Sequence, residues 1–161
     1  MSLGDAFPST FRRTQIENLL VPGAVLYLEV VFPEVTKDKF LVLVASQDEN
    51  CFNFIVNSET NAYIESRGHL SVCQVTLDAQ EHDFLDYDSQ IACHDVLPIP
   101  KREIIAALMA DFGRYKGKIS PAAKDGILSA VKHAVTLNKV RQREIIAGLE
   151  SQYPDMSLDL L

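Results

Sequence analysis

The residue types best suited to chemistry lie at the open end of a predicted β-hairpin. Lys39 precedes the apolar segment 40–46, and after a polar turn the segment 51–57 leads into the polar cluster 57–61 (NSETN). Pairing eight residues on each side of the turn places Lys39 opposite Ser58, at an interstrand spacing of roughly 5 Å. An ammonium group beside a hydroxyl can orient a phosphate and offset the negative charge that develops on it. The spacing therefore predicts a phosphate-binding pair at this end of the hairpin.

Simpler interpretations of the same residues stay open. Ser, Thr and Asn side chains often bond the local backbone of a turn, which requires no function. A lysine that faces a serine at the open end of a hairpin can equally be an ordinary solvated pair. The predicted register favours Ser58 over Thr60 as the partner of Lys39, and both hydroxyls remain candidates.

The other reactive side chains occur as isolated pairs. His69 and Cys73 have the sequence spacing of metal ligands, but they fall in a predicted loop and strand, where this spacing does not place both on one face. A metal site needs three or four converging ligands, so we predict no metal and no cofactor. Cys93 and His94 form a candidate nucleophile pair, although a buried structural cysteine is the commoner case.

Charge is distributed unevenly along the chain. Residues 47–95 contain ten acidic residues and one basic residue, Arg67, whereas residues 101–143 contain ten basic and three acidic residues. The first region would repel a phosphate backbone and the second would attract one, but solvated acidic and basic faces explain the same pattern. Within the acidic region, Asp86 and Asp88 either point the same way as paired acids or cap a tight loop.

Composition bounds the class of protein. A length of 161 residues predicts one domain, and 47% hydrophobic with 23% charged residues excludes intrinsic disorder. The apolar runs are as long as strands, far shorter than the roughly 20 residues of a membrane span. Three cysteines without C-x-x-C spacing favour a reducing cytoplasm. The Walker A, GxGxxG, HExxH and GxSxG motifs are missing, which argues against the corresponding enzyme classes.

Hydrophobic periodicity assigns the elements that must position these residues. Strands are predicted between Val21 and Ile99, with a core that includes Val25, Tyr27, Leu41, Leu43, Phe54, Val56, Val75 and Ile91. The period changes at Lys101, after which the pattern is helical. The expected strands cover residues 24–32, 40–46, 51–57, 71–78 and an extended stretch 89–99, and the expected helices cover 101–112, 121–134 and 138–151.

Strands first and helices last predict a mainly β or α+β fold, a small antiparallel barrel followed by two or three helices. We divide the chain into an N-terminal arm (1–20), a barrel domain with its helices (21–137), and a C-terminal helix and tail (138–161). The last helix carries an apolar stripe that one small barrel does not easily cover, which favours a homodimer. The stripe consists of Ile145, Ile146 and Leu149.

Five segments between residues 22 and 135 occur in the order and spacing of a known family. They are 22–27 (PGAVLY), 39–46 (KFLVLVAS), 88–93 (DSQIAC), 96–99 (VLPI) and 117–120 (GKIS). This set resembles the PemK/MazF-like toxins, small barrels that cleave mRNA and are paired with an antitoxin. The resemblance implies an SH3-like barrel, a homodimer, single-stranded RNA as substrate, an antitoxin protein as partner and no association with membranes.

The resemblance also implies a catalytic site made of Lys39, Ser58 and Thr60. The family has an arginine before a proline where this chain has Lys39 before Phe40, and an acidic residue where it has Ala24. Lysine keeps the positive charge but lacks the planar fork that suits a phosphate. The implied reaction needs no metal: the ribose 2′-oxygen attacks the adjacent phosphorus and leaves a cyclic phosphate and a free hydroxyl.

Three functions therefore remain open from the sequence. The first is a metal-independent endoribonuclease toxin of a toxin–antitoxin pair. The second is a catalytically weak relative of the same fold that acts as a binding or protein-interaction module. The third is a structural dimeric protein without a nucleic-acid role. Fold-level analogy alone does not decide among them.

Overall fold

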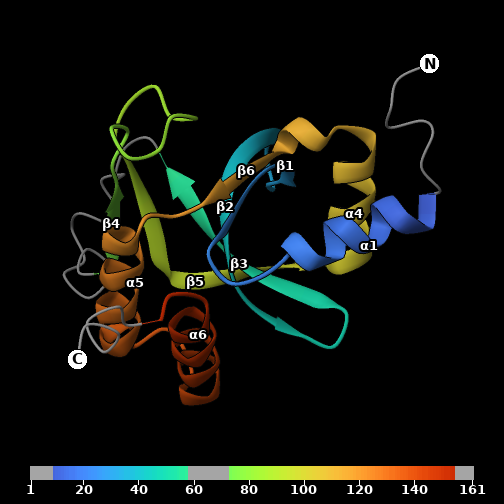
Figure 1. Ribbon diagram of the computed structural model, residues 1–161. Helices are drawn as coiled ribbons and strands as arrows, with labels where there is room; N and C mark the ends of the chain where they lie inside the picture. Colours follow the sequence, from blue (N-terminus) through green and yellow to red (C-terminus); the bar gives the residue numbers. More distant parts are fainter. Residues whose placement is uncertain (1–8, 58–72, 155–161) are drawn as a thin grey trace, which may run out of the picture.

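A curled, antiparallel half-barrel sheet of six strands forms the centre of an α+β fold (Figure 1). The computed structural model describes residues 9–57 and 73–154. The strand order across the sheet is β4-β5-β3-β2-β1-β6. The strands are β1 (Ala24–Val31), β2 (Thr36–Gln47), β3 (Asn50–Asn57), β4 (Gln74–Leu77), β5 (Ser89–Pro100) and β6 (Tyr115–Lys118).

Four described helices cover the two faces of this sheet (Figure 1). They are α1 (Ser9–Leu19), α4 (Lys101–Ala110), α5 (Pro121–His133) and α6 (Lys139–Gln152), with a short 3-10 turn, η2 (Phe112–Arg114), before β6. One apolar core joins the sheet to α5 and α6, and a second joins its other face to α1 and α4. None of the helices in the described ranges is long and apolar enough to cross a membrane.

Much of the predicted secondary structure is confirmed. The helix at Pro121–His133 begins as expected, because the Ser120 side chain accepts a hydrogen bond of 3.1 Å from the backbone N–H of Ala123. All predicted core residues are buried except Tyr27, which is half-buried at the rim of a pocket. The α+β class and the antiparallel sheet thus follow from the change in hydrophobic period at Lys101.

The expectation that helices occur only after Pro100 is wrong, because α1 forms within the segment expected to be an arm. Its Ile16 is 4% exposed, and Leu20 just beyond its end is 5% exposed; both pack in the core shared with α4. Arg12 also donates a 2.9 Å hydrogen bond to the carbonyl of Met109. The apolar residues of α1 are too few to give a clear helical pattern, so tertiary packing stabilises this helix.

Strands β2 and β6 differ from the prediction. Strand β2 begins at Thr36, before the expected strand at 40–46, because its charged start pairs with β1 through Val31↔Thr36 and the following positions. Strand β6, which was not expected, pairs with the start of β1 through Ala24↔Lys118. The charged start of β2 and the short polar strand β6 have little hydrophobic pattern, so pairing with β1 determines that they form strands.

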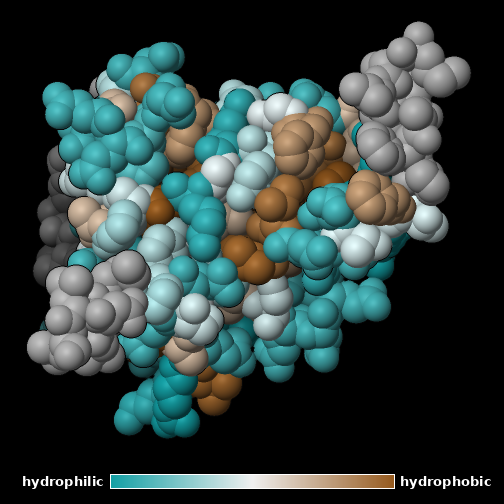
Figure 2. All heavy atoms as spheres, viewed as in Figure 1, coloured by the Kyte–Doolittle hydropathy of each residue, from teal (hydrophilic) through white to brown (hydrophobic). Residues whose placement is uncertain are grey.

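The apolar stripe of the last helix does not offer a dimer surface. Ile145 and Leu149 are fully buried, and Ile146 packs against the same core, which also contains the inner residues of β2 and α5. The physical reason given for a dimer is therefore wrong, because the curled sheet is wide enough to cover this helix. Apolar surface is visible instead beside α1 and α4 (Figure 2), where the half-exposed Phe11 and Phe112 line a groove of about 150 Å³.

Candidate functional site

Lys39 lies at the open end of the β2–β3 hairpin, bonded to the last residue of β3. Its ammonium group donates a 2.9 Å hydrogen bond to the side-chain oxygen of Asn57. The predicted register holds beside the turn, where Ser46 pairs with Cys51, but a bulge at Val44 shifts it by one residue, so that Leu41 pairs with Ile55. Continued by two residues, this shifted register brings Lys39 level with Asn57, in agreement with the hydrogen bond between their side chains.

The two hydroxyl candidates cannot be placed relative to this lysine. Ser58 and Thr60 lie outside the described residues, as does His69 of the candidate metal pair. Ser58 is covalently joined to Asn57, whose side chain holds Lys39. The catalytic set of Lys39, Ser58 and Thr60 therefore stays a prediction.

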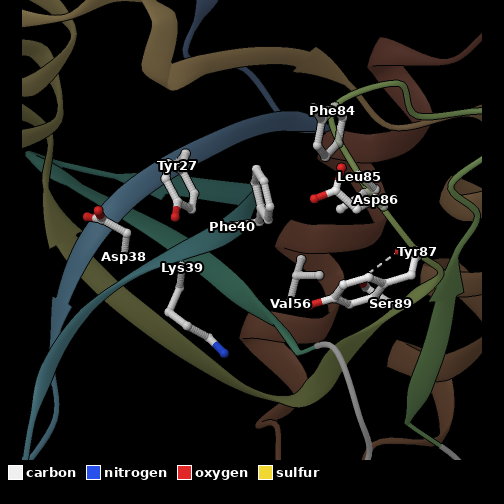
Figure 3. Close-up of a pocket in the computed structure, with 10 residues that line it drawn as sticks. All are labelled: Tyr27, Asp38, Lys39, Phe40, Val56, Phe84, Leu85, Asp86, Tyr87 and Ser89. Atoms are coloured by element: carbon white, nitrogen blue, oxygen red, sulfur yellow. Dashed lines mark hydrogen bonds between the residues drawn. The ribbon is translucent and has the colours of Figure 1, made fainter.

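A cavity of about 350 Å³ opens beside Lys39 (Figure 3). Its walls come from the middle of β1, the start of β2, the end of β3, the loop that joins β4 to β5, and the start of β5. We name it the aromatic pocket, since four of its lining residues carry rings. The lining residues are Tyr27, Asp38, Lys39, Phe40, Val56, Phe84, Leu85, Asp86, Tyr87 and Ser89.

A row of rings forms one wall of the aromatic pocket. Tyr27 and Phe40 are direct cross-strand partners, with ring centroids 4.6 Å apart, and Phe84 follows at 5.2 Å from Phe40. All three are half-buried, while Tyr87 on the opposite side is 59% exposed. The ammonium group of Lys116 lies 5.9 Å from the Tyr27 ring centre, within cation–π range. Half-buried rings with a nearby cation can stack planar groups such as nucleobases.

Lys39 brings a cation to the edge of the aromatic pocket, and its side chain points away from the Phe40 ring, toward Asn57 (Figure 3). Asp38 is partly neutralised by Arg114, whose guanidinium lies 3.4 Å away and is anchored by a 2.8 Å bond to the Tyr27 carbonyl. Asp86 lies on the opposite wall in the exposed loop (Figure 3), so it repels an anion from that side. Burial of the Lys39 ammonium lowers its pKa, and the nearby charge of Lys37 lowers it further.

The loop between β4 and β5 forms the far wall and uses its acidic residues as caps. Asp88 accepts a 2.8 Å hydrogen bond from the Ala79 N–H, and Asp78 accepts one of 2.7 Å from Gln80. For Asp88 the capped-loop interpretation is therefore the right one. The loop is strongly hydrophilic on its outer side (Figure 2, upper left).

A buried histidine fixes this loop to the helical layer. The Nδ1 of His82 lies 2.7 Å from the Asp78 carbonyl, and its Nε2 accepts a 3.0 Å hydrogen bond from the N–H of Ser120, the cap of α5. A neutral ring with its proton on Nδ1 satisfies both contacts. The ring also packs edge-on against Phe84, at 5.7 Å between centroids, and so holds the aromatic wall in place.

Replacing His82 with leucine should lower the free energy of unfolding by about 1–3 kcal/mol, because two backbone groups lose their partners. Urea denaturation followed by circular dichroism measures the change. His133→Ala is the matched control, since His133 is exposed and its Nδ1 lies 2.8 Å from the carbonyl of Ser129 in its own helix. Equal stabilities of the two variants would show that His82 is not an anchor.

The cysteine and metal alternatives gain no support from the described residues. Cys51, Cys73 and Cys93 are buried, and burial raises the pKa of each thiol, which opposes formation of a thiolate nucleophile. Within residues 9–57 and 73–154 no three His, Cys, Asp or Glu side chains converge as metal ligands.

Lys39 was predicted from the sequence as the cation of this site, but the aromatic side chains beside it were not predicted. Pairing the strand at 24–32 with that at 40–46 would have brought Tyr27 and Phe40 together, since both lie near the open end of the sheet. Phe84 reaches the same wall from an irregular loop, which no periodicity places. In comparisons with known proteins, no family model and no curated sequence matches this chain.

Proposed function

We propose that this protein is a metal-independent endoribonuclease of the PemK/MazF-like type, an SH3-like barrel that cleaves single-stranded RNA and is held in check by an antitoxin protein. The observation that carries the proposal is the position of Lys39. A half-buried lysine, held by Asn57 at the open end of a hairpin, borders a pocket lined with rings. A phosphate and a stacked base are what such a combination suits.

The chemistry starts from a phosphodiester bound at Lys39. The ribose 2′-hydroxyl loses its proton to water as its oxygen bonds the adjacent phosphorus. The bond from phosphorus to the 5′-oxygen breaks, that oxygen takes up a proton, and a 2′,3′-cyclic phosphate and a 5′-hydroxyl result. Lys39 offsets the negative charge that grows on the phosphoryl oxygens in the transition state. Ser58 or Thr60, which follow Asn57 in the chain, would position the phosphate or supply the proton to the leaving oxygen.

The rings give the substrate its orientation. Tyr27, Phe40 and Phe84 present a half-buried aromatic wall within the same cavity as the lysine. Stacking on such rings contributes about 1–3 kcal/mol for each base and requires bases that are not paired. This favours single-stranded RNA over a duplex as the substrate.

A second candidate function is favoured by the acidic wall. Asp86 lines the cavity without an ion pair among the described residues, and a lysine stands where the resembling family has an arginine. Both features weaken the binding of a polyanion such as RNA. A binding or protein-interaction module of the same fold, with little catalysis, is the alternative that these residues support.

Expression in a bacterial host separates the two functions. A ribonuclease toxin should arrest growth on induction, and the Lys39→Ala variant, expressed to the same level, should leave growth normal. A module without catalysis should leave growth equal for both proteins. The homodimer that the resemblance implies is tested by light scattering at micromolar concentration, where a single monomer mass would contradict it.

The lowered pKa of Lys39 predicts how phosphate binding responds to pH. As the pH rises through that lowered pKa, the ammonium loses its proton and its attraction for phosphate, below the range in which an ordinary lysine does so. Lys39→Arg should keep its charge and bind a 2′-O-methyl RNA oligonucleotide to a higher pH. Fluorescence anisotropy between pH 7 and 10.5 measures this. Parallel decline of both proteins would show that Lys39 is not the phosphate ligand.

A further inference from the structure

We propose that a second pocket binds a nucleobase that carries an exocyclic amino group. This pocket lies next to Lys39, on the opposite face of the sheet from the aromatic pocket. The inference rests on the proposed function, because it assigns a base-recognition site beside the phosphate at Lys39. We name it the bulge pocket. It has a volume of about 280 Å³ and is lined by Phe32, Ile55, Asn57, Ala92, His94, Asp95, Val96 and Leu97.

An irregularity in β5 forms the bulge pocket. Along the β3–β5 pair, Asn53 pairs with Leu97 and Ile55 pairs with Ala92, so two steps on β3 correspond to five on β5. The extra residues leave the regular ladder and turn His94 and Asp95 into the cavity lining. Bulges of this kind re-aim side chains and are over-represented next to active sites.

One atom of this pocket lacks the partner that its burial requires. The Nδ1 of His94 is inaccessible to solvent and has no hydrogen-bond partner in the described part of the chain. The backbone at this position is held in place, since the hydroxyl of Thr136 donates to the His94 carbonyl. Buried ring nitrogens without a partner are rare in folded proteins. Because solvent does not reach Nδ1, a ligand in the bulge pocket would bond it only after the His94 ring turns, so Asp95 supplies the polar contact of the site.

The remaining groups define the chemistry of the occupant. Phe32 supplies an aromatic face, with the ammonium of Lys37 lying 5.8 Å from its ring centre. The side chains of Ile55 and Leu97 supply apolar walls. The Asp95 carboxylate accepts a 2.9 Å hydrogen bond from the Val96 N–H, which fixes its orientation and leaves its other oxygen as an acceptor. A planar, partly apolar ligand that donates from an amino group fits this set.

Asn57 connects the bulge pocket to the phosphate position. Its side chain lines the bulge pocket and accepts the hydrogen bond from Lys39, which itself lines the aromatic pocket. A single strand whose phosphate lies at Lys39 therefore has one base directed to the rings and a neighbouring base directed to the bulge pocket. Cytosine and uracil are similar in shape, and cytosine alone carries an amino group.

Binding of 2′-O-methyl oligonucleotides tests this site without any cleavage, because the attacking hydroxyl is blocked. Fluorescently labelled oligo-C and oligo-U of about eight residues are titrated with the full chain. We expect oligo-C to bind about tenfold more tightly, within the 1–3 kcal/mol typical of a good base contact. Asp95→Asn should reduce this preference to less than twofold. Asp83→Asn is the control, since it removes the same charge from an exposed position outside the pocket.

The outcomes separate the pocket from the proposed nuclease. A cytosine preference lost in Asp95→Asn and kept in Asp83→Asn supports the pocket, even if unmodified RNA is never cleaved. Equal binding of oligo-C and oligo-U, no binding of either, or a preference unchanged in Asp95→Asn overturns the pocket. Cleavage of unmodified RNA in that case would leave the proposed nuclease standing without a base site in the β5 bulge.

Discussion

Lys39→Ala should lower the rate of RNA cleavage by about 100- to 1,000-fold at saturating substrate, the usual effect of removing one group that stabilises a developing oxyanion. The fold should survive, because Lys39 is half-exposed and its ammonium group bonds the side chain of Asn57 at the end of the sheet. Cleavage of a fluorogenic single-stranded RNA measures the rate, and thermal unfolding checks the fold.

The control for this variant is Lys132→Ala, which removes one positive charge from the exposed face of α5. It should change the rate less than twofold, since charges at the surface are screened over about 10 Å in 0.1 M salt. If both lysine variants retain the wild-type rate, Lys39 has no part in the chemistry and the site is elsewhere.

Phe54→Ala should lower the free energy of unfolding by about 3–5 kcal/mol, the range for truncating a fully buried aromatic side chain. Phe54 has no exposed surface and belongs to the core that joins the sheet to α5 and α6. A loss of this size is a large part of the 5–15 kcal/mol that stabilises a typical domain. Chemical denaturation in urea measures it.

A matched substitution on the surface of the same layer is Val140→Ala on α6, where the valine is 61% exposed. This variant should stay within about 0.5 kcal/mol of the wild type. A similar loss for both residues would mean that α6 and the sheet do not pack as described. A loss of less than about 1 kcal/mol for Phe54→Ala would contradict the position of the core.

The sequence was sufficient to predict the central strands of the sheet and its core, but not helix α1 or the edge strand β6. The apolar residues of 24–32 and 51–57 have one physical cause, burial of both strand faces in the two cores, and these segments form β1 and β3. Helix α1 and strand β6 have little apolar pattern of their own. Their stability comes from packing and pairing with distant residues, which a local pattern does not contain.

The candidate site was likewise predicted only in part from the sequence. Counting along a hairpin related Lys39 to Ser58, and the bulge at Val44, which the count did not include, shifts the register by one residue at Leu41 and Ile55. A bulge leaves no mark on the hydrophobic pattern when both alternative registers bury apolar residues, as they do around Val44. The bulge in β5 was not predicted for a similar reason, and the pocket around His94, which this bulge forms, was therefore not predicted either.

Incubation of the purified protein with a long single-stranded RNA in excess EDTA, followed by mapping of the cut sites and their termini, tests the central claim most directly. The account predicts cleavage that persists in EDTA, leaves 2′,3′-cyclic phosphate and 5′-hydroxyl ends, and is lost in Lys39→Ala. RNA that stays intact at high protein concentration would contradict the proposed nuclease, as would cleavage that EDTA abolishes.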